Sequence, residues 1–172
     1  MGAKQQGADA TNNRWLTIPR TLSFVTNGDD ILMMKRAPHR RVFPNQYNGL
    51  GGHIERDEDP LSGAIREIKE ESGLDVHSVC LRTIHNIDAG KETGIILFVY
   101  TAVANSREVI QDTNEGILEW IPKSKILEID LVEDLPFLIP KILDMGDNQA
   151  PIHAHVSYNS EDEIQLKFKE NS

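Results

Sequence analysis

The chain has 172 residues, a length that suits one domain with a buried core and short tails. Its 27 acidic residues outnumber the 18 basic ones and give a net charge of −9, which opposes binding to the phosphate backbone of a long nucleic acid. No apolar run is long enough to cross a bilayer or to act as a secretory signal, and one cysteine cannot form an internal disulfide, so we expect a cytoplasmic protein.

The first elements are a polar tail and a hairpin. Residues 1–13 lack apolar periodicity, and we interpret them as a disordered tail before a domain over residues 14–148. Two apolar runs within residues 21–37 flank the sequence Asn-Gly-Asp-Asp at 27–30. This pattern predicts a β-hairpin, because a tight turn needs residues that accept a positive φ.

A basic loop, a glycine-rich run and a helix follow. Residues 38–47 are basic and irregular, and residues 48–52 have the sequence Asn-Gly-Leu-Gly-Gly, so we predict a surface loop. Asp59 is followed by a proline, which is typical of an N-cap, and Gly73 suits the left-handed residue just past a helix end. These signals predict a helix over residues 60–72.

The second half of the chain mixes strand and helix signals, which predicts the α/β class. Strand-like runs occupy residues 81–87, 94–104 and 116–121. The apolar run at 135–143 predicts a late helix despite its internal proline. Residues 149–172 hold two alternating segments around a polar turn, which predicts a C-terminal β-hairpin extension packed on the domain.

The predicted helix carries an apolar stripe. At 100° per residue, counting from Leu61, the side chains of Ala64, Ile65 and Ile68 fall at about 300°, 40° and 340°. We expect this stripe to pack on the sheet.

Three glutamates, Glu67, Glu70 and Glu71, share an arc of about 100° away from the centre of that stripe. Two carboxylates about 6 Å apart repel by roughly 3 kcal/mol at an effective dielectric constant of 20. Arg66 can neutralise one of them, and clustered oxygen ligands are also what Mg²⁺ or Mn²⁺ selects. The alternative is an ordinary solvated helix face, which is common for charged segments.

The residues upstream favour the metal interpretation. Gly52, five residues, Glu58, seven residues and then Arg-Glu-Ile-Lys-Glu-Glu-Ser-Gly-Leu at 66–74 match the Nudix box at its nine specified positions. Chance would give such a match on the order of once in ten million chains. The chain therefore resembles the Nudix superfamily from about residue 21 to residue 143. The resemblance implies an α/β/α sandwich with a mixed β-sheet between helices, and hydrolysis of a nucleoside diphosphate linked to another group.

The resemblance also implies roles for the box residues. Glu67 and Glu71 would be the main ligands of Mg²⁺ or Mn²⁺, with Glu70 a further ligand or the general base. The carbonyl of Gly51 or Gly52 would add a ligand, because glycine lets the backbone approach without a Cβ clash. A metal-activated water would attack phosphorus, so no covalent nucleophile is required.

Four further residues have implied or alternative roles. Glu58 and Arg66 would support the loop and the helix. Glu115 resembles the additional acidic residue outside the box, which binds metal or acts as a base in some members, although it could simply be exposed. His53, beside the box glycine, is more often a loop residue than a catalyst.

The substrate side resembles MutT-like enzymes that hydrolyse oxidised purine nucleoside triphosphates. On that match Asn48 would hydrogen-bond the base and Lys35 would lie near the pocket. Glu133 and Asp134 would meet the purine edge. The alternatives are a turn role for Asn48 and helix N-terminal charges for the two acids. Leu131 stands where the mammalian MutT homologue has a tryptophan that stacks on the base.

We therefore predict conversion of a nucleoside triphosphate to its monophosphate and pyrophosphate by a monomer or homodimer that binds no membrane or nucleic acid polymer. The main alternative is an ADP-ribose or nucleotide-sugar pyrophosphatase, but that group commonly has a proline 15 to 17 residues beyond the box, where this chain has Asp-Ala-Gly at 88–90. A second alternative is a non-catalytic Nudix-fold nucleotide-binding module. Such modules usually lack box acids, and this chain keeps all of them.

Overall fold

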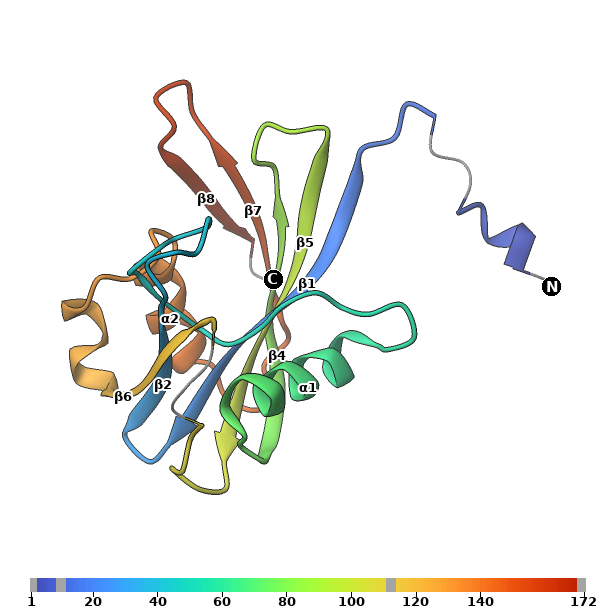
Figure 1. Ribbon diagram of the computed structural model, residues 1–172. Coiled ribbons are helices and arrows are strands. Elements are labelled where there is room, and N and C mark those ends of the chain that lie inside the picture. Colours follow the sequence, from blue (N-terminus) through green and yellow to red (C-terminus); the bar gives the residue numbers. More distant parts are fainter. Residues whose placement is uncertain (1–2, 9–11, 111–113, 170–172) are drawn as a thin grey trace.

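The computed structural model describes residues 3–8, 12–110 and 114–169 (Figure 1). The predicted disordered tail falls partly outside these residues and stays a prediction. None of the described helices is both long and apolar enough to cross a bilayer. The elements are η1 Ala3–Gln6, β1 Leu16–Asn27, β2 Asp30–Arg36, β3 Tyr47–Asn48, α1 Pro60–Ser72, β4 Val76–Ile87, β5 Thr93–Ala104, β6 Gly116–Pro122, η2 Lys123–Glu128, α2 Leu135–Leu143, β7 Ile152–Tyr158 and β8 Ile164–Lys169.

The described strands form one mixed sheet in the order β3-β2-β1-β5-β4-β7-β8, with β6 paired to β2. The pairs β1–β5 and β4–β7 are parallel, and the other pairs are antiparallel. Strand β2 pairs with β6 along its whole length, whereas β1 and β3 each pair with only part of it. The two parallel pairs join segments that are far apart in the sequence.

Apolar side chains cover both faces of this sheet. Phe24 and Val25 are neighbours on β1 and point to opposite faces, because side chains alternate along a strand. Phe24 lies in one core with Leu138 of α2, and Val25 lies in a second core with Ile68 of α1. The sheet is therefore enclosed between the two helices, which confirms the predicted α/β/α sandwich.

The local signals located most elements. The hairpin turn lies at residues 28–29, between β1 and β2. Helix α1 has the predicted bounds: the Asp59 carboxylate accepts hydrogen bonds from the N–H groups of Leu61 and Ser62, and Gly73 has a φ of 75°. Strand β4 begins five residues before its predicted start at 81, since register shifts along the strand break the alternation that marks a strand in sequence.

The prediction of the apolar stripe of α1 was wrong for one of its three residues. Ala64 and Ile68 are fully buried, but the side chain of Ile65 is 42% exposed. The buried residues of the helix are Gly63, Ala64, Ile68 and Ser72. Gly63 is buried against the loop before the helix, where an added Cβ would lie 2.9 Å from Oε1 of Glu58, and the buried Ser72 hydroxyl donates to the Ile68 carbonyl.

The C-terminal residues extend the sheet. Strand β7 pairs in parallel with β4, beginning with Ile152 opposite Thr83, and β8 completes an antiparallel hairpin at the edge. The division into a domain over 14–148 and an extension over 149–172 stays a prediction.

His85 on β4 is fully buried beside this hairpin. Its Nε2 lies 2.8 Å from the Thr83 hydroxyl, its ring meets the edge of Phe168, and its Nδ1 has no hydrogen-bond partner among the described residues. Burial lowers the pKa of His85 from 6.5 to about 4. The neutral ring is therefore favoured in the folded state.

We expect this ring to make stability depend on pH. Between the two pKa values the unfolded chain binds the proton more tightly than the folded protein does. The contribution of neutral His85 to the free energy of unfolding is therefore complete above pH 6.5 and is lost as the pH falls towards 4. The loss should reach at most about 3 kcal/mol. Urea unfolding at pH 7 and pH 5 measures it, with His85→Gln as the non-titrating comparison. Equal losses in the wild type and the variant would contradict the assignment.

Candidate active site

The glycine-rich segment lies between β1 and β2 where these strands diverge. Its first residues pair with β2, and its later residues bond to β1. Leu50 and Ser23 exchange both backbone hydrogen bonds, at 2.6 and 3.0 Å, and the Thr21 N–H donates to the Gly52 carbonyl at 2.9 Å. The segment is therefore fixed against β1, next to α1.

Two of its glycines lie so close to other groups that an added Cβ would overlap them. A Cβ on Gly51 would lie 2.2 Å from the Thr21 carbonyl oxygen, and the φ of 151° at Gly51 is itself rare for other residues. A Cβ on Gly52 would lie 2.5 Å from Oε1 of Glu67. The backbone therefore lies directly against a carboxylate of the helix.

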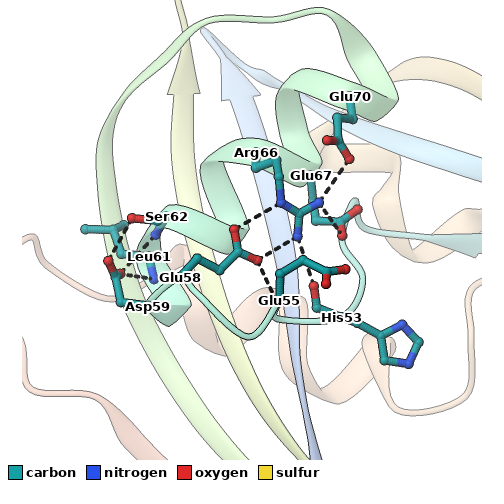
Figure 2. Close-up of polar contacts among 9 residues, drawn as sticks. All are labelled: His53, Glu55, Glu58, Asp59, Leu61, Ser62, Arg66, Glu67 and Glu70. Carbon is teal, nitrogen blue, oxygen red and sulfur yellow. Dashed lines mark hydrogen bonds and ion pairs between the residues drawn. The ribbon is translucent and has the colours of Figure 1, made fainter.

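Arg66 ties the loop before α1 to the helix (Figure 2). Its Nε donates to one carboxylate oxygen of Glu58 at 3.0 Å, and its Nη2 donates to the other at 2.7 Å. Nη2 also donates to the His53 carbonyl, while Nη1 donates to Glu67 and Glu70 at 3.0 and 2.9 Å. The Arg66 guanidinium holds the pKa of Glu58 below its usual value. These contacts fix residues 53–58 on α1.

Glu67 and Glu71 lie on the inner side of the helix. Glu71 accepts a hydrogen bond from the Gly51 N–H at 2.9 Å. Burial, reinforced by the charges of Glu67 and Glu115, raises the pKa of Glu71 to about 8. Burial also raises the pKa of Glu67, although Arg66 opposes this. Glu70 instead points outward, with its side chain 59% exposed.

Glu115, which is 44 positions beyond Glu71 in sequence, is brought to the same place. It precedes β6, and its carboxylate lies 2.8 Å from Nη2 of Arg40. It is close enough to contribute to the raised pKa of Glu71. Three predicted acids, Glu67, Glu71 and Glu115, therefore gather where the glycine-rich segment meets α1.

The predicted substrate residues lie in two places. Lys35 pairs with Tyr47 across β2 and β3, and its Nζ is 5.6 Å from the centre of the Tyr47 ring. Asn48 is the next residue and faces the other side of the sheet, where its side-chain oxygen accepts a hydrogen bond from the Gly49 N–H. Lys35 and Asn48 therefore do not share a face.

Glu133 and Asp134 precede α2. Glu133 is exposed, and the Asp134 side chain makes no capping hydrogen bond. Burial, with a smaller effect of Glu133, raises the pKa of Asp134 to about 6. Burial, with smaller effects of Glu133 and Asp134, raises the pKa of Tyr158, which ends β7, and Leu131 is buried in the core on the α2 side. These two acids thus lie near the C-terminal hairpin.

Sequence reasoning missed two arginines, Arg36 at the end of β2 and Arg40 in the basic loop that follows. Arg36 is half-buried and feels the charges of Arg40, Glu115 and Glu71, which places it beside the carboxylates. In the sequence these arginines belong to a basic run within an acidic chain. That run was the available signal, although it did not show which residues face the site.

The residues present fit a hard divalent cation. Within the described ranges no group of three or more histidine, cysteine or acidic side chains is arranged as a metal site, since Glu67 is held by Arg66 and Glu71 by the Gly51 N–H. The donors are nevertheless all oxygens, which suits Mg²⁺ or Mn²⁺. A cation would compensate the buried charge of Glu71, whose pKa is raised by burial and by the neighbouring carboxylates, and the absence of a Cβ at Gly52 lets the Glu67 carboxylate lie against the loop.

Comparisons with known proteins agree with this geometry. A family model described as the NUDIX domain matches residues 17–141. The chain is 34% identical over 68 residues to the m7GpppN-mRNA hydrolase NUDT17 of Homo sapiens, covering 40% of this chain and 21% of that protein. It is 37% identical over 59 residues to the NAD-capped RNA hydrolase NudC of Stutzerimonas stutzeri, covering 34% and 20%. The chain thus spans about a fifth of the length of these curated relatives.

A solved structure shows the same fold. The MutT mutator protein of Bacillus halodurans superposes with a TM-score of 0.75 at 22% identity, covering 88% of this chain and 97% of that one. At this identity the likeness concerns the fold alone.

Proposed function

Because the chain belongs to the NUDIX domain family, we propose that it is a divalent-metal-dependent hydrolase that converts a nucleoside triphosphate, such as an oxidised purine nucleotide, to its monophosphate and pyrophosphate. The observation that carries the proposal is the convergence of Glu67, Glu71 and Glu115 beside the glycine-rich segment. A diphosphate brought to these acids needs a cation between them, since both are negatively charged.

The contacts support a particular set of metal ligands. Glu67 and Glu71 would hold Mg²⁺ or Mn²⁺ together with a backbone carbonyl. Of the two candidate carbonyls, that of Gly52 already accepts the Thr21 N–H, which favours Gly51. When bound, the cation would lower the pKa of a coordinated water and neutralise charge on the phosphate oxygens.

Two carboxylates could accept the proton of the attacking water. Glu115 lies within electrostatic reach of Glu71, whereas Glu70 points outward to Arg66. We therefore propose Glu115 as the general base and Glu70 as an outer ligand or support. Arg66 would act by positioning Glu67, to which it donates a hydrogen bond.

The nucleoside would extend towards the start of α2. Asp134 titrates near pH 6, so at neutral pH its carboxylate can accept N–H groups of a base. Lys35 and Tyr47 lie on the α2 side of the sheet, as does Leu131. Asn48 would contribute from the other face of the sheet, since accepting the Gly49 N–H engages only its side-chain oxygen and leaves its NH2 group to donate.

A second candidate function comes from the relatives. Two of them are named as hydrolases of m7G-capped mRNA and of NAD-capped RNA, and their matches cover 40% and 34% of this chain. A 5′ cap contains the same kind of phosphoanhydride linkage as a nucleoside triphosphate. The net charge of −9 argues against a long RNA partner, so we rank this candidate below the triphosphate.

A substrate panel tests both functions. Normal and oxidised purine triphosphates, ADP-ribose, a nucleotide sugar, NAD and capped RNA are incubated with the protein and Mg²⁺, and the products are identified by chromatography. We expect triphosphates to be cleaved fastest, to monophosphate and pyrophosphate, with activity lost in a chelator and restored by Mg²⁺ or Mn²⁺. Faster cleavage of ADP-ribose or capped RNA would overturn the substrate assignment, and no cleavage at all would leave a nucleotide-binding module.

A further inference from the structure

The loop between β2 and β3 is fixed beside the acidic cluster formed by Glu67, Glu71 and Glu115. Arg36 ends β2 and lies opposite Gly116 in the register with β6. The Ala37 N–H donates to the Glu115 carbonyl at 2.8 Å, and the Arg40 side chain reaches the Glu115 carboxylate at 2.8 Å. Backbone and side-chain contacts therefore hold both arginines beside Glu115.

The Arg36 side chain is anchored through one of its three nitrogens. Its Nε donates to the Val42 carbonyl at 2.8 Å, and no hydrogen bond to another described residue engages its two terminal nitrogens. A guanidinium is rigid and planar, and its paired N–H groups match two oxygens of a phosphate. Because one nitrogen is already anchored, the Arg36 side chain loses less conformational entropy when its other two nitrogens bind a ligand.

The charges around Arg36 also suit an anion. Arg40 and Arg20 repel it, whereas Glu115 and Glu71 attract it. The proposed function places a divalent cation against Glu71, which would offset part of that attraction. The positive charge of the arginines would then remain for the substrate.

We propose that Arg36, assisted by Arg40, binds a phosphate group of the substrate through its two terminal nitrogens, opposite the carboxylates of α1. The proposal rests on the proposed function for its location, but it makes a separate claim: affinity for a polyphosphate depends on this guanidinium whatever base is attached. Arg36 is thus a substrate-binding residue and not a metal ligand.

Inorganic tripolyphosphate with Mg²⁺ is a probe that has no base. Its affinity is measured by calorimetry for the wild type, Arg36→Gln, Arg36→Lys and Arg40→Gln, with the exposed Arg14→Gln as a control for loss of one charge. We expect binding to weaken about 10- to 100-fold in Arg36→Gln, which removes charge-assisted hydrogen bonds. Arg36→Lys should lose less because it keeps the charge without the paired donors, and Arg14→Gln should bind as the wild type.

The outcomes separate this proposal from the proposed function. Equal binding by the wild type and Arg36→Gln, or no binding by the wild type, overturns the role of Arg36. If tripolyphosphate binding depends on Arg36 but the protein cleaves no nucleotide, the role of Arg36 is supported and the proposed function is contradicted. Circular dichroism checks folding, and if Arg36→Gln does not fold, Arg36→Lys and Arg40→Gln decide, since unchanged binding in both would overturn the proposal.

Discussion

Replacing Glu71 with glutamine should lower kcat by about a thousandfold or more, because it removes a ligand charge from the proposed cation without changing the shape of the side chain. The fold should not be destabilised. The amide oxygen can still accept the Gly51 N–H, and the substitution removes a buried acid whose ionisation is disfavoured by burial and by the charges of Glu67 and Glu115. Steady-state kinetics in Mg²⁺ and thermal unfolding in a chelator measure the two effects.

A matched control is available in Glu128→Gln, which makes the same change at an exposed position of η2. It should leave both kcat and the unfolding temperature unchanged. Glu71→Gln with wild-type turnover would exclude this residue as an essential ligand. A large drop in the unfolding temperature would show that Glu71 stabilises the fold and would make the loss of activity uninformative.

Alanine at Gly51 and at Gly52 should separate an effect on folding from an effect on catalysis. At Gly51 the new Cβ meets the Thr21 backbone and the φ of 151° is unfavourable, so we expect a loss of about 4 kcal/mol in unfolding free energy. At Gly52 the Cβ meets only the Glu67 carboxylate, which can rotate away. Gly52→Ala should therefore fold but lose about a hundredfold in kcat, because a ligand is displaced.

Gly146→Ala is the control for these variants. No atom lies within 4 Å of its added Cβ, so its unfolding free energy should change by less than about 0.5 kcal/mol. Urea unfolding and kinetics on all three variants provide the test. Full activity in Gly52→Ala would mean that the position of Glu67 is not critical. Equal destabilisation in Gly51→Ala and Gly52→Ala would show that the Glu67 carboxylate cannot rotate away from the new Cβ.

Helix α1 shows what local sequence can decide. Its N-cap, its proline and its left-handed C-cap each act within a few residues, and the predicted bounds agree with the structure. The spacing from Gly52 to the box glutamates likewise predicted the family that the comparisons then showed. Strand β4 was placed less well, since the irregularities at its start arise from pairing with β5.

The side of α1 that faces the sheet could not be found from a helical wheel. The wheel weighs hydrophobicity alone and therefore included Ile65, whereas the structure exposes Ile65 and buries the small residues Gly63 and Ser72. Burial in the folded protein is also the main cause of the raised pKa values of Glu67 and Glu71.

Helix α1, its caps and the box motif could be recognised from residue order, because these features depend on contacts between near neighbours in the chain. Only the tertiary structure brought Glu115, Arg36 and Arg40 to that helix, since the pairing of β2 with β6 joins segments about 80 residues apart. Burial and the field of distant charges then set the pKa values of the site, and both quantities exist only once the chain has folded.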